Sequence, residues 1–286
     1  MPKGRISVIL SSYNRPDLLR KSLLSLNMQT VLPYEVIITD DGSKVDIPVK
    51  LNNLISILNF KLKYIWQPDK GFRLSKSRNN AIREVAGDYV IFMDQDIIHT
   101  RGYIETYKKN MRANEFLTAF LVLLSKEQSD KVSEESIING EYLNIITKRQ
   151  LETISKQYLK DTFYYYQRKL ILKNDYRPKV RGGYFGLHKK HIIEINGFDE
   201  NYVGWGWEDD DFGRRLYKNN VIGRTVFKNE FPIHLYHPEN HDNTGNSVNT
   251  EYFNKRVREI NNGDIRAVVG LEESNPDKEM KIIELN

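Results

Sequence analysis

The chain has 286 residues, a formal net charge of +5 and no cysteine. Hydrophobic residues make up 40% of the sequence and charged residues 28%, values near the globular average that exclude a largely disordered chain. The lack of cysteine excludes a disulfide scaffold, a cysteine-ligated metal site and a cysteine nucleophile, whereas the positive charge is spread along the chain and selects no class of partner.

Strand and helix periods alternate over the first hundred residues. We predict strands at Ile6–Ser11, Tyr34–Thr39, Leu62–Trp66 and Tyr89–Met93, and helices at Pro16–Met28, Val49–Leu58 and Ser75–Val85. This alternation indicates an α/β fold with a parallel sheet and right-handed crossovers. Ligands bind at the carboxyl ends of such strands. We therefore expect one crevice to collect the polar residues after the four strands, which are Ser11–Asn14, Asp40–Ser43, Gln67–Gly71 and Asp94–Asp96.

The second half of the chain is less regular. We predict a helix at Gly102–Ala113, a strand at Phe116–Leu124, a helical Lys- and Tyr-rich region at Ser133–Lys173, a helix over Phe212–Asn219 and an extended segment at Val226–Tyr236. The last 23 residues, 264–286, carry six acids and three bases and are predicted to form a tail or a peripheral clamp. We divide the chain into an N-terminal half (1–100), a second half of the same domain (101–262) and a C-terminal tail (263–286).

The apolar segments of the sequence are short. The longest, around residues 116–124, falls far below the roughly 20 residues of a membrane-spanning helix. Met1–Arg5 lead into the first strand without an apolar signal core. These features predict a cytoplasmic protein, and peripheral association with the inner face of the membrane stays open. With no continuous basic stripe, we predict no nucleic-acid partner, and the sequence does not indicate an oligomeric state.

Two acidic residues, Asp94 and Asp96, follow the fourth predicted strand. Residues i and i+2 of an extended chain project to the same side, so the two carboxylates repel each other unless a cation lies beside them. Mg²⁺ or Mn²⁺ typically bridges such carboxylates to substrate phosphates. The alternative is a pair of solvated loop acids.

Four consecutive acids, Glu208–Asp211, stand at the predicted start of a helix, next to Trp205 and Trp207. The helix dipole favours acids there, but four exceed what a cap needs. Indole faces beside carboxylates suit a sugar, and a carboxylate on a hydroxyl can act as a general base. Core packing is the alternative for the tryptophans.

His234 and His237 lie three residues apart on a segment predicted to be extended. Their side chains are therefore expected to face roughly opposite sides, with at most one pointing at a given ion. An imidazole together with a carboxylate favours Mn²⁺ over Mg²⁺.

Several further residues have both a binding and a structural interpretation. Asp40 and Asp41 precede Gly42-Ser43, so they suit either a base or ribose contact or an ordinary turn. The pair Gly182-Gly183 permits close approach of the backbone to a ligand. Three residues around the third helix could reach a diphosphate or a base, or lie on the surface: Arg73, Arg78 and Asn79.

Taken together, these segments resemble a family 2 glycosyltransferase of the GT-A fold. The N-terminal half carries the resemblance in Ser7–Arg15, Val36–Ser43, Lys70–Arg73, Ser77–Asn79 and Phe92–Asp96. The second half resembles the galactosyltransferase-type C-terminal region of β-1,4-galactosyltransferases and bacterial chondroitin-type polymerases, through Arg181–Gly186, Gly197–Asp199 and Gly204–Asp211. The resemblance covers about residues 5–240. It implies a Rossmann-like, mostly parallel central sheet flanked by helices, with a C-terminal extension on the acceptor side. It also implies that residues 1–100 bind the nucleotide sugar and that residues 101–262 bind the acceptor and carry the catalytic groups.

The resemblance also implies roles for individual residues. Contacts to the nucleotide sugar fall to Ser11, Tyr13, Arg15, Asp41, Arg78, Asp94 and Gly183. Contacts to the acceptor or the sugar fall to Trp205, Trp207, Glu208 and Asp210. Asp209 matches the catalytic base, Asp96 matches the direct metal ligand, and either His234 or His237 matches a further ligand, with His234 favoured.

The resemblance implies an inverting transfer of a sugar, with galactose or N-acetylgalactosamine favoured, from a UDP-sugar to a hydroxyl of a glycan or lipid-linked glycan. Mn²⁺ or Mg²⁺ is the implied cofactor and bacterial surface polysaccharide the implied setting. Relatives that modify polypeptides retain stereochemistry and lack the acidic run, which favours inversion here. A sugar nucleotidyltransferase and a non-catalytic carbohydrate-binding protein are the alternatives.

Overall fold

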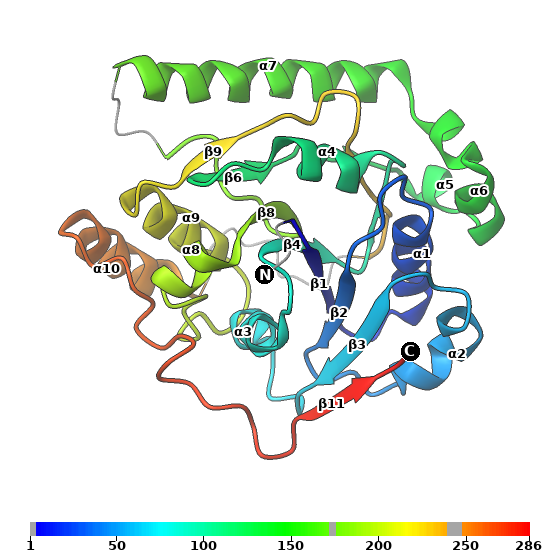
Figure 1. Ribbon diagram of the computed structural model, residues 1–286, viewed down its shortest axis with the longest axis horizontal. Helices are drawn as coiled ribbons and strands as arrows, with labels where there is room; N and C mark the ends of the chain where they lie inside the picture. Colours follow the sequence, from blue (N-terminus) through cyan, green and yellow to red (C-terminus); the bar gives the residue numbers. More distant parts are fainter. Residues whose placement is uncertain (1–3, 172–175, 239–247) are drawn as a thin grey trace.

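The computed structural model describes residues 4–171, 176–238 and 248–286. Its centre is an eight-stranded sheet in the order β11-β3-β2-β1-β4-β8-β6-β9 (Figure 1). The strands of this sheet are β1 Ile6–Ser12, β2 Glu35–Asp40, β3 Lys61–Trp66, β4 Tyr89–Asp94, β6 Glu115–Thr118, β8 Tyr184–His188, β9 Ile222–Arg224 and β11 Lys281–Glu284. The four strands from the N-terminal half, β1 to β4, are all parallel, which confirms the predicted α/β fold with a mostly parallel sheet.

Helices cover both faces of the sheet. The helices of the described residues are α1 Pro16–Asn27, α2 Ile47–Ile55, α3 Leu74–Glu84, α4 Tyr103–Asn110, α5 Lys126–Ser129, α6 Glu134–Asn139, the 3-10 helix Glu141–Ile145, α7 Lys148–Ile171, α8 Lys189–Glu194, α9 Glu208–Lys218 and α10 Thr250–Asn261. Side chains alternate along β1, so that Val8 and Leu10 join a core with α1 and α2 while Ile9 joins a second core with α3 and α9. Burial on both faces explains why β1 is a continuous apolar run.

A second, three-stranded sheet positions part of the site. It consists of β5 Ile97–His99, β10 Pro232–His234 and β7 Val122–Leu123, with β10 in the middle. β10 is antiparallel to β5 with His234 opposite Ile97, and the Leu235 amide donates to the Asp96 carbonyl at 2.9 Å. This pairing brings the histidine-bearing segment beside the loop that follows β4.

The seven elements predicted in the first hundred residues are confirmed, with ends shifted by up to three residues. The single strand predicted at Phe116–Leu124 is wrong. The segment divides into β6 and β7 because the two parts have different partners: β6 pairs with β8 and β9 in the large sheet, and β7 pairs with β10 in the small one. Of the predicted extended segment Val226–Tyr236, only Pro232–His234 is a strand.

The other predictions for the second half differ mainly in length. The predicted helix Gly102–Ala113 is observed as Tyr103–Asn110, and the helix predicted to start at Glu208–Asp211 and continue over Phe212–Asn219 is observed as Glu208–Lys218. The Lys- and Tyr-rich region is helical as predicted, although its last two predicted residues, 172 and 173, lie outside the described residues.

The C-terminal segment is a clamp and not a loose tail. β11 adds antiparallel to β3 at the edge of the sheet. Before it, Asp277 pairs with Lys70 at 2.9 Å and with Arg73 at 3.0 Å. Within the part of the chain that the structure describes, no helix combines the length and apolarity needed to cross a membrane.

Candidate active site

Asp96 and two histidines form a cluster suited to a metal ion. The His237 Nε2 atom lies 2.8 Å from one carboxylate oxygen of Asp96, and the His234 Nε2 atom lies 3.9 Å from the other. One ligand atom from each of the three residues can be chosen so that all lie within 4.8 Å of one another. The expectation that only one histidine faces the site is wrong, because β10 ends at His234 and the alternation of an extended strand does not continue to His237. The oxygen and nitrogen donors suit Mn²⁺, so the residues fit the cofactor that the sequence implies.

The groups around Asp96 favour its ionised form. Burial tends to raise the pKa of Asp96, but the hydrogen bond from His237 and the nearby charge of His234 outweigh it and lower that pKa. Arg15 adds a further positive charge 3.7 Å from Asp96. The carboxylate therefore stays ionised, as a metal ligand must.

Arg78 connects the two acidic groups that the sequence places far apart. Its guanidinium is buried on α3, donates to Asp209 Oδ1 at 2.9 Å and lies 3.5 Å from Asp94 Oδ1. Asp94 ends β4 and Asp209 lies in the first turn of α9, so one cation joins the two halves of the chain. Burial raises the pKa of both carboxyls, that of Asp94 to about 6, and Arg78 opposes the rise.

The glycine pair lies directly against these carboxylates. A Cβ atom on Gly182 would come within 2.2 Å of Asp209 Oδ2, and one on Gly183 within 2.2 Å of Asp94 Oδ2. Gly183 also has a φ of +76°, which favours glycine. The backbone of the loop before β8 therefore closes one side of the site at van der Waals distance from both acids.

Gly183→Ala is expected to lower kcat/KM by about 10–100-fold, because its methyl group would push Asp94 away from Arg78. The strained backbone adds a loss of about 1–2 kcal/mol in unfolding free energy. Steady-state kinetics and urea unfolding measure the two effects. Gly140→Ala is the matched control, since Gly140 has a φ of +83° but its Cβ would meet its nearest neighbour at an ordinary 3.5 Å. If both variants lose activity equally, contact with Asp94 is not the cause.

The four acids of α9 have four different environments. Asp209 meets Arg78, Asp210 accepts from Lys179 at 2.7 Å, and Asp211 forms a fully buried pair with Arg215 at 2.9 Å. Glu208 is buried, and its Oε2 atom has no hydrogen-bond partner among the described residues. Burial, reinforced by the charge of Asp209, raises the pKa of Glu208 to about 7.

Glu208→Gln is expected to stabilise the protein at about pH 8 by about 1–3 kcal/mol and to change little at about pH 4. The pKa of Glu208 is about 7 in the folded protein but lies near its ordinary value of 4.5 in the unfolded chain, so the folded protein keeps the proton to a higher pH. The folded state therefore binds more protons in this window, and its stability falls as pH rises through it. Urea unfolding at the two pH values measures the effect. Glu135→Gln, an exposed acid in the first turn of α6, is the control. Equal stability of Glu208→Gln and wild type at the higher pH would contradict the argument.

The two tryptophans beside the acidic run differ in their packing. The Trp207 ring stacks on Phe253 of α10 at 4.4 Å and its Nε1 donates to Thr250 at 3.1 Å. One face of this ring is therefore covered by protein, as the alternative of core packing anticipates. Trp205 exposes 57% of its surface. Of the two indoles, Trp205 has more surface available for an acceptor.

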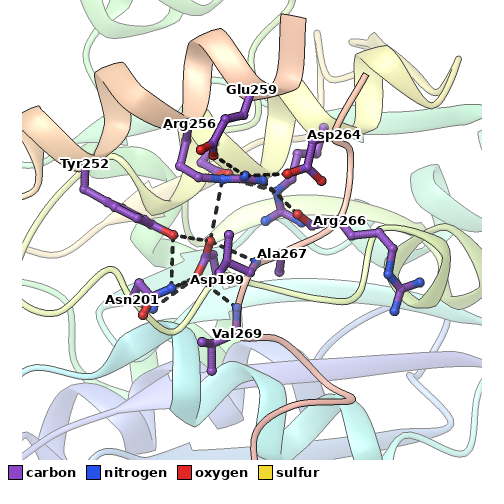
Figure 2. A network of polar contacts seen from close by, with 12 residues as sticks. Asp199, Asn201, Tyr252, Arg256, Glu259, Asp264, Arg266, Ala267 and Val269 are labelled. Atoms are coloured by element: carbon purple, nitrogen blue, oxygen red, sulfur yellow. Dashed lines mark hydrogen bonds and ion pairs between the residues drawn. The ribbon is translucent and has the colours of Figure 1, made fainter. Parts of the chain in front are cut away.

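A network around Asp199, for which no role was predicted, holds the loop that leads into α9 (Figure 2). Asp199 accepts from Tyr252 on α10 at 2.8 Å and from the Val268 amide at 3.2 Å. Arg256, fully buried on α10, lies 3.8 Å from Asp199 and donates to Asp264 at 3.0 Å. Because these partners lie more than 50 residues away in the chain, no local signal could have identified the network.

The nucleotide side of the crevice is built from the loops after β1 and β2. Ser11 is buried, and its hydroxyl has no partner among the described residues. Tyr13 is partly exposed and its hydroxyl donates to Asp69 at 3.1 Å. Gln95, the middle residue of the Asp94–Asp96 motif, accepts from the Tyr13 amide at 3.0 Å. No role was predicted for Gln95, which fixes the first loop to the metal-binding loop.

For the remaining residues, the structure distinguishes those that can contact a ligand from those that hold the fold together. Asp40 caps a turn by accepting from the Ser43 amide, whereas Asp41 accepts from the Arg73 amide at 2.6 Å and burial raises its pKa to about 6. The Arg73 side chain pairs with Asp277. Asn79 bonds the backbone of Phe198 in both directions. Arg73 and Asn79 therefore act as structural links here, and Arg78 alone of the three faces the acids.

Comparison with known families identifies the family of the chain. The sequence model of glycosyl transferase family 2 matches residues 7–175, more than half of the chain. The chain belongs to glycosyl transferase family 2. A second model, for the N-terminal domain of galactosyltransferase, matches residues 165–238 of this family 2 member and covers the glycine pair and the acidic run. The resemblance drawn from the sequence is confirmed.

Curated relatives of this family 2 member are longer proteins. Chondroitin synthase of Escherichia coli is 30% identical over 236 residues, which are 77% of this chain and 33% of the relative. Hyaluronan synthase of Pasteurella multocida is 26% identical over 231 residues, which are 77% of this chain and 24% of the relative. The chain thus spans a third or less of the length of these relatives.

Solved structures share the fold. Staphylococcus aureus TarS in complex with UDP-GlcNAc has a TM-score of 0.62 at 16% identity, over 94% of this chain and 68% of that chain. GalNAc-T7 with UDP, GalNAc and Mn²⁺ has a TM-score of 0.61 at 14% identity, over 90% of this chain and 48% of that chain. At these identities the likeness shows the fold alone, which is the GT-A fold predicted from the sequence.

Proposed function

We propose that this family 2 member is an inverting, metal-dependent glycosyltransferase that moves a sugar from a UDP-sugar to a glycan hydroxyl. The observation that carries the proposal is that Asp94 and Asp209 share the buried Arg78. Since Asp96 lies two residues after Asp94, a donor held at the metal cluster would lie near a carboxylate placed to receive a proton.

Donor binding is assigned to the loops after β1, β2 and β4. The Ser11 hydroxyl, which has no partner within the described part of the chain, and the exposed side chain of Tyr13 are available to a nucleoside. Asp41 can accept from a base N–H or a ribose hydroxyl. Asp96, His234 and His237 would hold Mn²⁺ or Mg²⁺, which when bound supplies Lewis-acid neutralisation of the diphosphate. Arg15 adds positive charge beside the same carboxylate.

The chemical step is assigned to Asp209. Its carboxylate takes the proton of the acceptor hydroxyl while the oxygen forms a bond to the anomeric carbon. On the opposite face of that carbon, the bond to the β-phosphate oxygen breaks and UDP leaves with the electron pair. Arg78 orients Asp209 and opposes the effect of burial on its pKa, which favours the ionised form that a general base needs.

Acceptor binding is assigned to Trp205, Glu208 and Asp210, with Trp207 holding the loop through Phe253. Galactose or N-acetylgalactosamine is the proposed donor sugar, supported by the match to the galactosyltransferase domain model. The relatives named chondroitin synthase and hyaluronan synthase support a polysaccharide acceptor, and we propose a role in bacterial surface polysaccharide synthesis. The cytoplasmic location stays a prediction.

The test is a screen of UDP-sugars for UDP release by the purified protein, with Mn²⁺, Mg²⁺ or a chelator, followed by a panel of glycan acceptors. The proposal expects UDP release that depends on both the metal and the acceptor. A nucleotidyltransferase would instead release pyrophosphate from a nucleoside triphosphate, and a carbohydrate-binding protein would show affinity without turnover. Either of those results rejects the proposal.

A further inference from the structure

Helix α7, Lys148–Ile171, lies along the outside of the molecule, beyond β9 and α4 (Figure 1). Its inner face is anchored by the buried side chains of Ile154 and Tyr165. Between them Asp161 pairs with Arg181 at 2.8 Å. These contacts fix the orientation of the helix, and with it the direction in which the opposite face points.

The outer face of α7 carries an apolar stripe. The stripe consists of Leu159, Phe163, Tyr166 and Leu170, which expose between 54% and 78% of their surface. Their spacing of four, three and four residues places them on one side of a helix with 3.6 residues per turn, opposite Ile154, Asp161 and Tyr165. Single exposed apolar residues are normal, but a continuous exposed stripe marks an interaction surface.

Most of the charged residues of α7 are basic. The helix contains six basic residues, Lys148, Arg149, Lys156, Lys160, Arg168 and Lys169, and two acids, Glu152 and Asp161. Asp161 is buried against Arg181, so Glu152 is the acid left outside the protein interior. Lys156 and Lys160 are exposed and adjoin the stripe on the helix surface. Arg168 instead stacks over the Tyr217 ring, so the surface is apolar along its centre and basic along the edge formed by Lys156 and Lys160.

We propose that the outer face of α7 docks on an anionic lipid surface, with the helix lying in the plane of the membrane. An apolar stripe with a basic border is the pattern by which a helix enters the boundary between head groups and acyl chains. Anionic head groups would attract the lysines, and the acyl region would bury the four stripe side chains. With 24 residues the helix is about 36 Å long, which gives an extended line of contact.

Charge argues against a second copy of this chain as the occupant. Two α7 helices packed stripe to stripe would bring the basic border of one against the basic border of the other, with Glu152 as the sole outward acid of each helix. Like charges across an interface oppose association, whereas an anionic membrane complements the whole border. The proposal goes beyond the glycosyl transfer and does not depend on it.

The test is co-sedimentation of the full chain with phosphatidylcholine vesicles, with and without about one-third phosphatidylglycerol, in the absence of donor and acceptor. Wild type should bind the anionic vesicles and bind the neutral vesicles far more weakly. Phe163→Ser combined with Leu170→Ser should lower the partition coefficient by about ten-fold or more, because two anchoring side chains are lost. Lys156→Glu combined with Lys160→Glu should weaken binding as strongly and remove its dependence on salt.

The matched control is Val49→Ser combined with Ile57→Ser, which removes two exposed apolar side chains from the region of α2. This control should bind vesicles as wild type does. The charge-reversed variant changes exposed side chains only, so it remains informative if the serine variant fails to fold. No binding by wild type to anionic vesicles, or equal loss in the α2 control, overturns the proposal. Sedimentation equilibrium showing a wild-type dimer that the stripe variant dissolves, without vesicle binding, would assign the surface to self-association instead.

Discussion

Replacing Asp209 by asparagine is expected to lower kcat by about 10²–10⁴-fold while leaving the fold intact, because the amide cannot accept the proton of the acceptor. The amide oxygen can still accept from Arg78, so the link between α3 and α9 need not be lost. Initial rates of UDP formation with saturating donor and acceptor measure the effect. Thermal unfolding of the same preparation checks that the protein is folded.

The control for this variant is Glu134→Gln. Glu134 pairs with Arg20 at 2.7 Å, much as Asp209 pairs with Arg78 at 2.9 Å, but both residues lie outside the candidate site and the Asp199 network. Loss of the same kind of ion pair should therefore change kcat little. Turnover by pure Asp209→Asn close to that of wild type would show that Asp209 is not the base.

The pH dependence of turnover should also reflect the role of Asp209 as the base. Burial raises the pKa of Asp209, and only the ionised carboxylate can act as a base. Activity should therefore fall as pH decreases through that raised pKa, at a higher pH than an exposed aspartate would give. Burial raises the pKa of Asp94 to about 6, and Asp94 lies beside the same Arg78 guanidinium. The fall in activity at low pH therefore reflects the titration of both carboxyls together.

Local sequence patterns predicted the half of the sheet that is formed by successive strands and helices. β1 to β4 are joined by helical crossovers, so the spacing of apolar residues and the turn residues between segments were enough to predict these strands and helices. The strands β8, β6, β9 and β11 are arranged by pairing between distant segments, which leaves no local period to detect. The division of residues 116–124 between two sheets has the same origin, since β6 pairs with β8 and β7 pairs with β10, and both partners are distant in the chain.

The candidate site was predicted better in its residue types than in its geometry. The sequence identified the acidic run, but successive residues of a helix point about 100° apart. Position along the chain therefore could not show that Asp209 would meet Arg78 while Asp211 would meet Arg215. The contact of Gly182 and Gly183 with the two acids depends on tertiary packing, as does the Asp199 network of Figure 2.

Asp96→Ala is expected to abolish metal-dependent turnover and high-affinity binding of Mn²⁺, because it removes the carboxylate of the cluster and leaves two neutral donors. His237→Ala should raise the Mn²⁺ concentration needed for half-maximal activity by about ten-fold or more, and His234→Ala should do so as well if both imidazoles are ligands. Titration of each protein with Mn²⁺, followed by electron paramagnetic resonance without donor, separates metal binding from catalysis.

His191→Ala is the matched control for the histidines. His191 pairs with Glu194 at 2.7 Å, as His237 pairs with Asp96 at 2.8 Å, but it lies on α8 and is no member of the cluster. Its loss should leave the Mn²⁺ titration unchanged. A wild-type enzyme insensitive to chelator, or a His237→Ala variant that binds Mn²⁺ as wild type does, would contradict the assignment. In the second case the close His237–Asp96 contact would be a structural ion pair, and the metal would be held by Asp96 and His234 with ligands from the substrate.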